Sequence, residues 1–227
     1  MFLYTRNAKT NSSKKNGKDK KQAAVQEEVT AAIPQVLLPD YPQDRSIGLM
    51  GDVSEELASG VISALITLGN SACREEAEEA NGKLKTNVVC DPIEMYISTN
   101  GGSAADMFAI YDTMRMVRKV CDISTVGLGK VMSAGVLILA AGSKGERRIG
   151  KNCRVMIHNV IGHHEGPIFT IENEMAEMKW TQERYVNALC EETKMTRKVL
   201  DKLLGQKTNI YLSAEEAVKY GIADKVV

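Results

Sequence analysis

The sequence has no net charge and no long apolar run. Lysine plus arginine and aspartate plus glutamate each number 29 among the 227 residues. This balance argues against a dedicated nucleic-acid-binding protein and against a polybasic membrane binder. No apolar run approaches the ~20 residues of a membrane-spanning helix, and the N-terminus lacks the apolar segment of a signal peptide. We therefore expect a cytoplasmic protein without a membrane segment.

Metal-binding and redox motifs are also missing. None of the five cysteines forms a CxxC motif, and no cysteines or histidines stand in pairs at zinc-site spacing. His163 and His164 are adjacent, but a solvated loop is the favoured interpretation. An odd number of widely spaced cysteines in a cytoplasmic protein predicts free, mostly packed thiols. We expect no metal ion and no cofactor.

The character of the chain changes at about residue 44. The first thirty residues are rich in Asn, Ser and Lys and show little apolar periodicity. We expect residues 1–44 to be a mobile tail or pro-segment followed by an extended lead-in that contains three prolines. From residue 45 to 227, short apolar strands alternate with amphipathic helices, which predicts one α/β domain with a mostly parallel sheet.

Two segments of this domain depart from the alternation. Residues 69–92 are charged and irregular, so we expect an exposed insertion that could include a helix. Residues 168–192 form a long amphipathic pattern that predicts a single helix. The stripe along this helix consists of Ile171, Met175, Met178, Gln182, Tyr185 and Leu189.

Three predicted strand ends carry residues that could bind a ligand or take part in catalysis. Parallel βα units place functional groups on loops at the C-terminal ends of their strands. The first loop contains Gly101 and Gly102, which let the backbone approach a ligand closely or simply form a tight turn. The third contains His158, which would be a general base only beside an activated nucleophile.

The second loop places Ser133 at a strand-to-helix turn. A hydroxyl there lies near free N–H groups and the positive end of the helix dipole, which favour an oxyanion. The alternative is that Ser133 only caps the helix. The sequence is not the G-x-S-x-G elbow of α/β-hydrolases, because Val131 replaces the first glycine.

Several collinear segments together resemble the proteolytic subunit of the caseinolytic Clp protease, the ClpP family. The similarity extends from about Arg45 to Val227. Its clearest segments are YISTNGGS at 96–103, AIYDTM at 109–114, MSAGVLILAAG at 132–142, MIH at 156–158 and LSAEEA at 212–217.

The resemblance implies a ClpP/crotonase-like α/β fold with βα repeats and a protruding handle helix, here residues 168–192. It implies a homo-oligomer of two stacked seven-membered rings that enclose a chamber. It also implies that an AAA+ unfoldase, a Clp ATPase, feeds unfolded polypeptide into the chamber with ATP. No nucleic-acid or membrane partner is implied.

The resemblance also assigns roles to residues of the site. Ser133 matches the nucleophile and His158 the general base of a serine endopeptidase. Gly102 and Ala134 match the two N–H donors of the oxyanion hole. Gly101, Gly102 and Gly135 lie in segments that bind the extended substrate.

The family's third catalytic residue is an aspartate, whereas Asn209 stands at the matching position. The equivalent change in a chymotrypsin-type protease costs about 10⁴-fold in rate, yet Cys-His-Asn proteases orient their histidine with asparagine. Three hypotheses remain. The chain is an attenuated Clp-type serine peptidase, or a catalytically inactive subunit that assembles with active subunits or an unfoldase. The third, a crotonase-type acyl-CoA enzyme, is disfavoured by the Ser133 and His158 motifs.

Overall fold

The fold is described here from a computed structural model, which describes residues 44–80, 83–206 and 208–227. The predicted N-terminal tail at 1–44 lies outside these residues, apart from Asp44. The remaining chain, Asp44–Val227, forms one unit. Within the described residues, no helix is both long and apolar enough to cross a membrane.

A mostly parallel sheet organises this unit, as the alternation of strands and helices predicts. The strands run in the order β1-β4-β5-β6-β9, and β7 pairs with the second half of β5 and with β8. Among the described strands of this sheet, only the β7/β8 pair is antiparallel. The strands are β1 (Ser46–Met50), β4 (Ile93–Thr99), β5 (Ile123–Met132), β6 (Arg147–Ile149), β7 (Arg154–Ile157), β8 (Ile210–Leu212) and β9 (Lys225–Val226).

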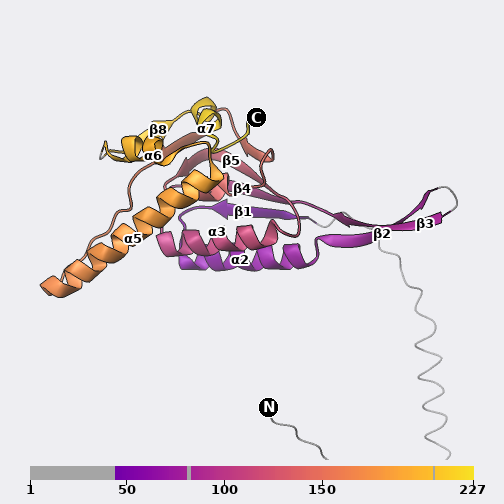
Figure 1. Ribbon diagram of the computed structural model, residues 1–227, viewed down its shortest axis with the longest axis horizontal. Coiled ribbons are helices and arrows are strands. Elements are labelled where there is room, and N and C mark those ends of the chain that lie inside the picture. Colours follow the sequence, from indigo (N-terminus) through magenta and orange to yellow (C-terminus); the bar gives the residue numbers. More distant parts are fainter. Residues whose placement is uncertain (1–43, 81–82, 207) are drawn as a thin grey trace, which may run out of the picture. The chain divides into compact units, whose positions relative to one another are not determined.

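Helices cover the sheet and bury its apolar side chains. In Figure 1, α2 and α3 lie side by side along one face, while α6 and α7 lie with β8 on the other side. Every residue of α4 is buried, so this short helix forms the centre of the core. The helices are α2 (Glu55–Asn70), α3 (Ala104–Val117), α4 (Ala134–Ala140), α5 (Ile168–Glu192), α6 (Arg197–Leu204) and α7 (Ala214–Tyr220).

The long helix α5 covers residues 168–192, as the sequence pattern predicts. Only its second half is packed into the domain, where Tyr185 and Leu189 are buried. Its first half extends away from the other helices (Figure 1) and carries exposed apolar side chains. The periodicity therefore predicts the helix correctly, but a single chain buries only part of its stripe.

The insertion at 69–92 is a β-hairpin, so the option of a helix there was wrong. Strand β2 (Cys73–Ala80) pairs antiparallel with β3 (Lys83–Cys90) as a separate two-stranded sheet (Figure 1). The strands pair up to Ala80 and Lys83, and the sequence between them is Asn-Gly. Asn-Gly is a strong signal for a two-residue hairpin turn, which the charge pattern of the flanking residues obscured.

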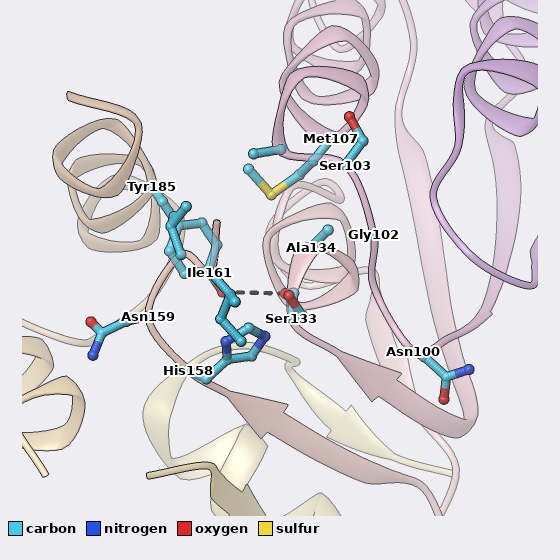
Figure 2. Close-up of a pocket in the computed structure, with 12 residues that line it drawn as sticks. Asn100, Gly102, Ser103, Met107, Ser133, Ala134, His158, Asn159, Ile161 and Tyr185 are labelled. Carbon is cyan, nitrogen blue, oxygen red and sulfur yellow. Dashed lines mark hydrogen bonds between the residues drawn. The ribbon is translucent and has the colours of Figure 1, made fainter. Parts of the chain in front are cut away.

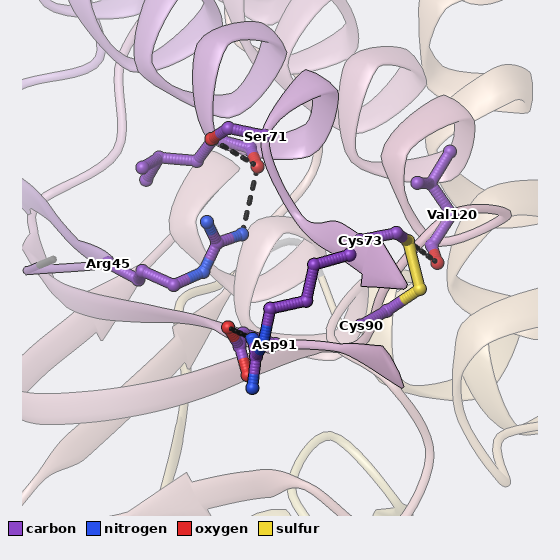
Figure 3. Close-up of a disulfide and its surroundings, with 8 residues drawn as sticks. Arg45, Ser71, Cys73, Cys90, Asp91 and Val120 are labelled. Carbon is purple, nitrogen blue, oxygen red and sulfur yellow. Dashed lines mark hydrogen bonds and ion pairs between the residues drawn. A yellow bond between two sulfur atoms is a disulfide. The ribbon is translucent and has the colours of Figure 1, made fainter. Parts of the chain in front are cut away.

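A disulfide closes the base of this hairpin, which corrects the expectation of five free thiols. Cys73 and Cys90 are direct cross-strand neighbours and are bonded to each other (Figure 3). Arg45 lies near the same base, where it donates hydrogen bonds to the carbonyl oxygens of Leu68 and Pro92. The three remaining cysteines are free: Cys121, Cys153 and Cys190.

Candidate active site

Strand register explains why three separate loops meet at one place. β5 and β7 are parallel, and Met132 at the end of β5 pairs with Met156, one residue before the end of β7. Ser133 and His158 therefore follow the ends of neighbouring strands. Thr99 at the end of β4 pairs with Val131, which brings the loop after β4 to the same edge. The sheet therefore places the predicted serine, histidine and glycine loops together.

Ser133 has an unusual backbone conformation. Its φ is 53° and its ψ is −119°, and it is the non-glycine residue with positive φ in the described part of the chain. Such a conformation is costly and persists only where neighbouring contacts hold it. The Ser133 N–H donates to the Met156 carbonyl oxygen at 2.8 Å, and the Ser133 carbonyl accepts from the Val136 N–H at 3.0 Å.

The Ser133 hydroxyl does not cap the helix. Ser133 occupies the position before α4, but its side chain makes no capping hydrogen bond. By contrast, Ser103 caps α3 and Ser213 caps α7 through their hydroxyl groups. The alternative of Ser133 as a plain helix cap therefore lacks its main interaction, and the hydroxyl is left for another role.

The glycines next to Ser133 are required by close contacts. A Cβ on Gly101 would lie 2.5 Å from the Ser133 Cβ, and Gly101 has a φ of 98°. A Cβ on Gly102 would lie 2.2 Å from the Val53 carbonyl oxygen. A Cβ on Gly135 would lie 2.4 Å from the Thr99 Cγ2. These glycines let the β4 loop and the start of α4 pack directly against the serine turn.

Two N–H groups at this turn have no hydrogen-bond acceptor within residues 44–80, 83–206 and 208–227. They belong to Gly102 and Ala134, the predicted oxyanion donors. The flanking groups of Gly102 are paired, since Val53 N–H donates to the Gly101 carbonyl and Ser103 N–H donates to the Val53 carbonyl, both at 2.8 Å. This pairing fixes the peptide around Gly102 while leaving its own N–H free to bind a ligand.

His158 lies next to Ser133 in the cleft (Figure 2). Its Nδ1 atom is buried and has no hydrogen-bond partner in the described part of the chain. In a serine-histidine pair, this nitrogen is the one that a third residue normally holds. The hydrogen bond between the histidine and the serine is often long in unliganded sites and tightens only with substrate.

Asn209 lies at the register position beside His158 but does not hold it. The antiparallel β7/β8 pairing joins Ile157 to Ile210, and continuing it by one step would pair His158 with Asn209. The Asn209 side chain is exposed. The strand register therefore puts Asn209 next to His158, but Asn209 makes no hydrogen bond to the His158 Nδ1.

The cleft that contains these groups has a volume of about 320 Å³. Its lining includes Gly102, Ser133, Ala134 and His158, whereas Gly101 and Gly135 do not line it. Tyr185 also lines the cleft, although the sequence pattern places it only on the apolar stripe of the long helix. No group of three or more potential metal ligands gathers anywhere in the described residues.

The family profile of the Clp protease matches residues 82–227, which is more than half of the chain. The chain belongs to the Clp protease family. The match covers β4 through β9 and therefore every residue of the candidate site. It establishes the ClpP-like α/β fold and places the chain among ClpP-type proteases, whose members form rings that work with Clp ATPases.

Proposed function

We propose that the chain is a serine endopeptidase subunit of a Clp-like protease, with Ser133 as the nucleophile and His158 as the general base. The proposal rests on the Ser133 hydroxyl, which makes no capping hydrogen bond although it stands on a strained turn at the N-terminus of α4. Ser133 and His158 line the same cleft. Family membership favours peptide hydrolysis over the acyl-CoA chemistry of crotonase-type enzymes.

In the proposed reaction, the Ser133 Oγ attacks the carbonyl carbon of a peptide while His158 accepts its proton. His158 then protonates the leaving amine, and water releases the acyl group from Ser133 by the reverse sequence. The free N–H groups of Gly102 and Ala134 would stabilise the negative charge that develops on the carbonyl oxygen. The backbone at Gly101, Gly102 and Gly135 would bind the extended substrate.

We also propose the assembly that the family suggests: a homo-oligomer of two stacked seven-membered rings that receives unfolded polypeptide from an AAA+ unfoldase. The exposed half of α5 supports an interface there, because apolar side chains rarely gather on a free surface without a partner. Its exposed apolar residues are Ile168, Phe169, Met175 and Trp180.

We further propose that residues 1–44 precede a single catalytic domain at 45–227, and that the protein resides in the cytoplasm. The disulfide between Cys73 and Cys90 bears on the location, since stable disulfides are rare in a reducing compartment. Mass spectrometry of the protein from cells, with free thiols blocked before lysis, would test it. A reduced pair supports the cytoplasm, and an oxidised pair argues against it.

A second candidate is a catalytically inactive ring subunit. Two observations favour it: the His158 Nδ1 has no partner in the described part of the chain, and the Asn209 side chain is exposed. Without an acceptor at Nδ1, the histidine lacks both its orientation and the charge that stabilises its protonated form. Such a subunit would build the chamber without cutting peptide.

Cleavage of a short fluorogenic peptide by the assembled protein separates the two candidates. A short peptide reaches the site without an unfoldase, so the assay tests the site alone. We expect Ser133→Ala to reduce turnover by at least about 10³-fold, because the nucleophile acts as a unit with its base. Ser71→Ala, which removes an exposed hydroxyl at the end of α2, is the matched control and should leave turnover unchanged.

Wild-type turnover that survives in Ser133→Ala would contradict the assignment of the nucleophile. An intact ring with no turnover and no covalent labelling by a fluorophosphonate would favour the inactive subunit.

A further inference from the structure

Tyr185 on α5 reaches the backbone of the proposed nucleophile. Its side chain lines the cleft and is only 4% exposed. Its hydroxyl donates a hydrogen bond to the Ser133 carbonyl oxygen at 3.2 Å, which is the dashed line in Figure 2. The contact joins residues 52 positions apart, so it ties the long helix to the serine turn.

This contact acts on a residue whose conformation needs support. Ser133 has a φ of 53°, and the direction of its Oγ depends on that turn. Met156 holds the N–H group of Ser133, while Val136 and Tyr185 both donate to its carbonyl oxygen. Of these three contacts, the Tyr185 hydroxyl is the one supplied by a side chain, so it can be removed without altering the backbone.

The chemistry of Tyr185 suits a permanent donor. A buried hydroxyl is costly without a partner, and the Ser133 carbonyl supplies one. Burial raises the pKa of Tyr185 well above its usual range, so the phenol keeps its proton. The side chain therefore has no ionised form at any pH at which the enzyme would work.

The same helix also holds the loop of the histidine. One turn before Tyr185, the Oε1 atom of Gln182 accepts a hydrogen bond from the Val160 N–H at 2.7 Å. Val160 is two residues after His158. Helix α5 therefore contacts the Ser133 turn and the loop after His158 through the polar atoms of Tyr185 and Gln182.

We propose that Tyr185 is a positioning residue that fixes the Ser133 turn, so that the packed half of α5 sets the direction of the nucleophile. The inference rests on the proposed function, because Tyr185 acts on the reaction only through Ser133. Within the described residues, the Tyr185 hydroxyl makes no hydrogen bond to Gly101 or Gly102, where we propose that substrate binds, and none to the His158 ring.

Tyr185→Phe tests this, with Tyr111→Phe as the matched control. Both tyrosines are almost fully buried, and both donate one hydrogen bond at 3.2 Å, Tyr111 to the side chain of Glu192 at the end of α5. We expect both variants to fold, since Glu192 keeps Arg118 and Lys144 and the Ser133 carbonyl keeps the Val136 N–H. The two variants should have similar melting temperatures.

Their kinetics should differ. We expect Tyr185→Phe to lower kcat for the short peptide by about tenfold with KM unchanged, because a small displacement of the nucleophile slows the chemical step. Fluorophosphonate labelling of Ser133 should slow by a similar factor. Tyr111→Phe should match the wild type in both assays. Replacing Tyr185 by 3-fluorotyrosine, which keeps the ring and the hydroxyl, should retain at least half of the wild-type kcat.

Equal kcat values in Tyr185→Phe and Tyr111→Phe would overturn the inference and leave the proposed function intact. A rise in KM at constant kcat would also overturn it, since Tyr185 would then only shape the cleft. If instead Ser133→Ala retains turnover, the proposed function fails first, and Tyr185 has no nucleophile to position.

Discussion

Ser133 and His158 line one cleft, but the domain supports them very differently. The Ser133 backbone is held at its N–H by Met156 and at its carbonyl by Val136 and Tyr185. Gly101 packs against its Cβ. On the other side, the His158 Nδ1 is buried without a partner in the described residues, and Asn209 is exposed.

The difference shows which parts of a serine-histidine site depend on the fold and which depend on one side chain. Strand register, close glycine contacts and backbone hydrogen bonds maintain the serine turn. The orientation and charge of the histidine depend on a single acceptor at its Nδ1. Here Asn209 lies at the register position beside His158 but makes no hydrogen bond to that nitrogen. The nucleophile side is therefore preorganised, while the base side lacks its usual support.

Asn209→Asp should remove this difference and have the largest effect. A carboxylate next to His158 can accept a hydrogen bond from the Nδ1–H group and stabilise the imidazolium that forms during attack. We expect kcat for the short peptide to rise by about 10²-fold or more, with the ~10⁴-fold effect of the reverse change in a chymotrypsin-type protease as the upper limit. Steady-state kinetics on the assembled ring measures it.

Asn152→Asp controls for the added negative charge, because Asn152 is an exposed residue in the turn between β6 and β7. It should leave kcat unchanged. An Asn209→Asp variant no faster than this control would mean that the missing carboxylate is not what limits the site.

Gly101→Ala should damage the well-supported side instead. The new Cβ would lie 2.5 Å from the Ser133 Cβ, on a residue with a φ of 98° that strains any side chain. A displacement of the nucleophile by about 1 Å can cost about 10²-fold in rate, and we expect a loss of that size in kcat/KM. Turnover of the short peptide and the melting temperature should be measured together.

Gly60→Ala is the control for this substitution, since Gly60 lies within α2 and a Cβ there meets open space. It should keep full activity and gain about 0.5–1 kcal/mol of stability from better helix formation. If Gly101→Ala remains within twofold of the wild type, the tight packing around Ser133 is not needed for its function.

The sequence predicted the well-supported side of the cleft better than the rest. Alternating apolar residues and paired glycines place the β4 loop, and the apolar run after Ser133 places α4. Parallel strands then bring these loops together by a general rule. The strain at Ser133 was not predictable, because a positive φ at a serine has no local pattern and results from tertiary contacts.

Contacts between side chains and residues far apart in the sequence were also not predictable. Tyr185 and Gln182 belong to the amphipathic stripe of α5, and periodicity gives only the face that a residue occupies. It does not tell which loop that face contacts. The pairing of Cys73 with Cys90 was hidden in the same way, because it follows from hairpin register that the charged segment did not suggest.

The ion pair between buried Arg147 and partly buried Asp224 allows a third, smaller test. Arg147 is 3% exposed, and its guanidinium donates two hydrogen bonds to Asp224, at 2.5 and 2.8 Å. Its backbone N–H donates a third at 3.1 Å. Its Nη1 also donates to the carbonyl oxygens of Ala140, at the end of α4, and Glu192, at the end of α5. The pair therefore anchors α4, which begins after Ser133, and α5, which carries Tyr185.

The pair should make the stability of the domain depend on pH at the acid end. The hydrogen bonds from Arg147 lower the pKa of Asp224 from 3.8 to about 2. A carboxyl group with a lower pKa in the folded state stabilises the fold above its unfolded pKa, and this contribution is lost as the pH falls toward 2. At 1.36 kcal/mol per pKa unit, the contribution near neutral pH is about 2 kcal/mol.

Asp224→Asn should therefore lose about 2 kcal/mol of unfolding free energy at pH 7 and flatten its decline between pH 4 and 2. Urea titrations at several pH values measure both effects. Asp201→Asn removes one of the two acidic partners of Arg197, in an exposed pair, and should cost much less stability. An Asp224→Asn variant with the wild-type acid profile would show that the anchoring of α4 and α5 does not depend on this charge. The support of the serine turn would then come from its backbone contacts and Tyr185 alone.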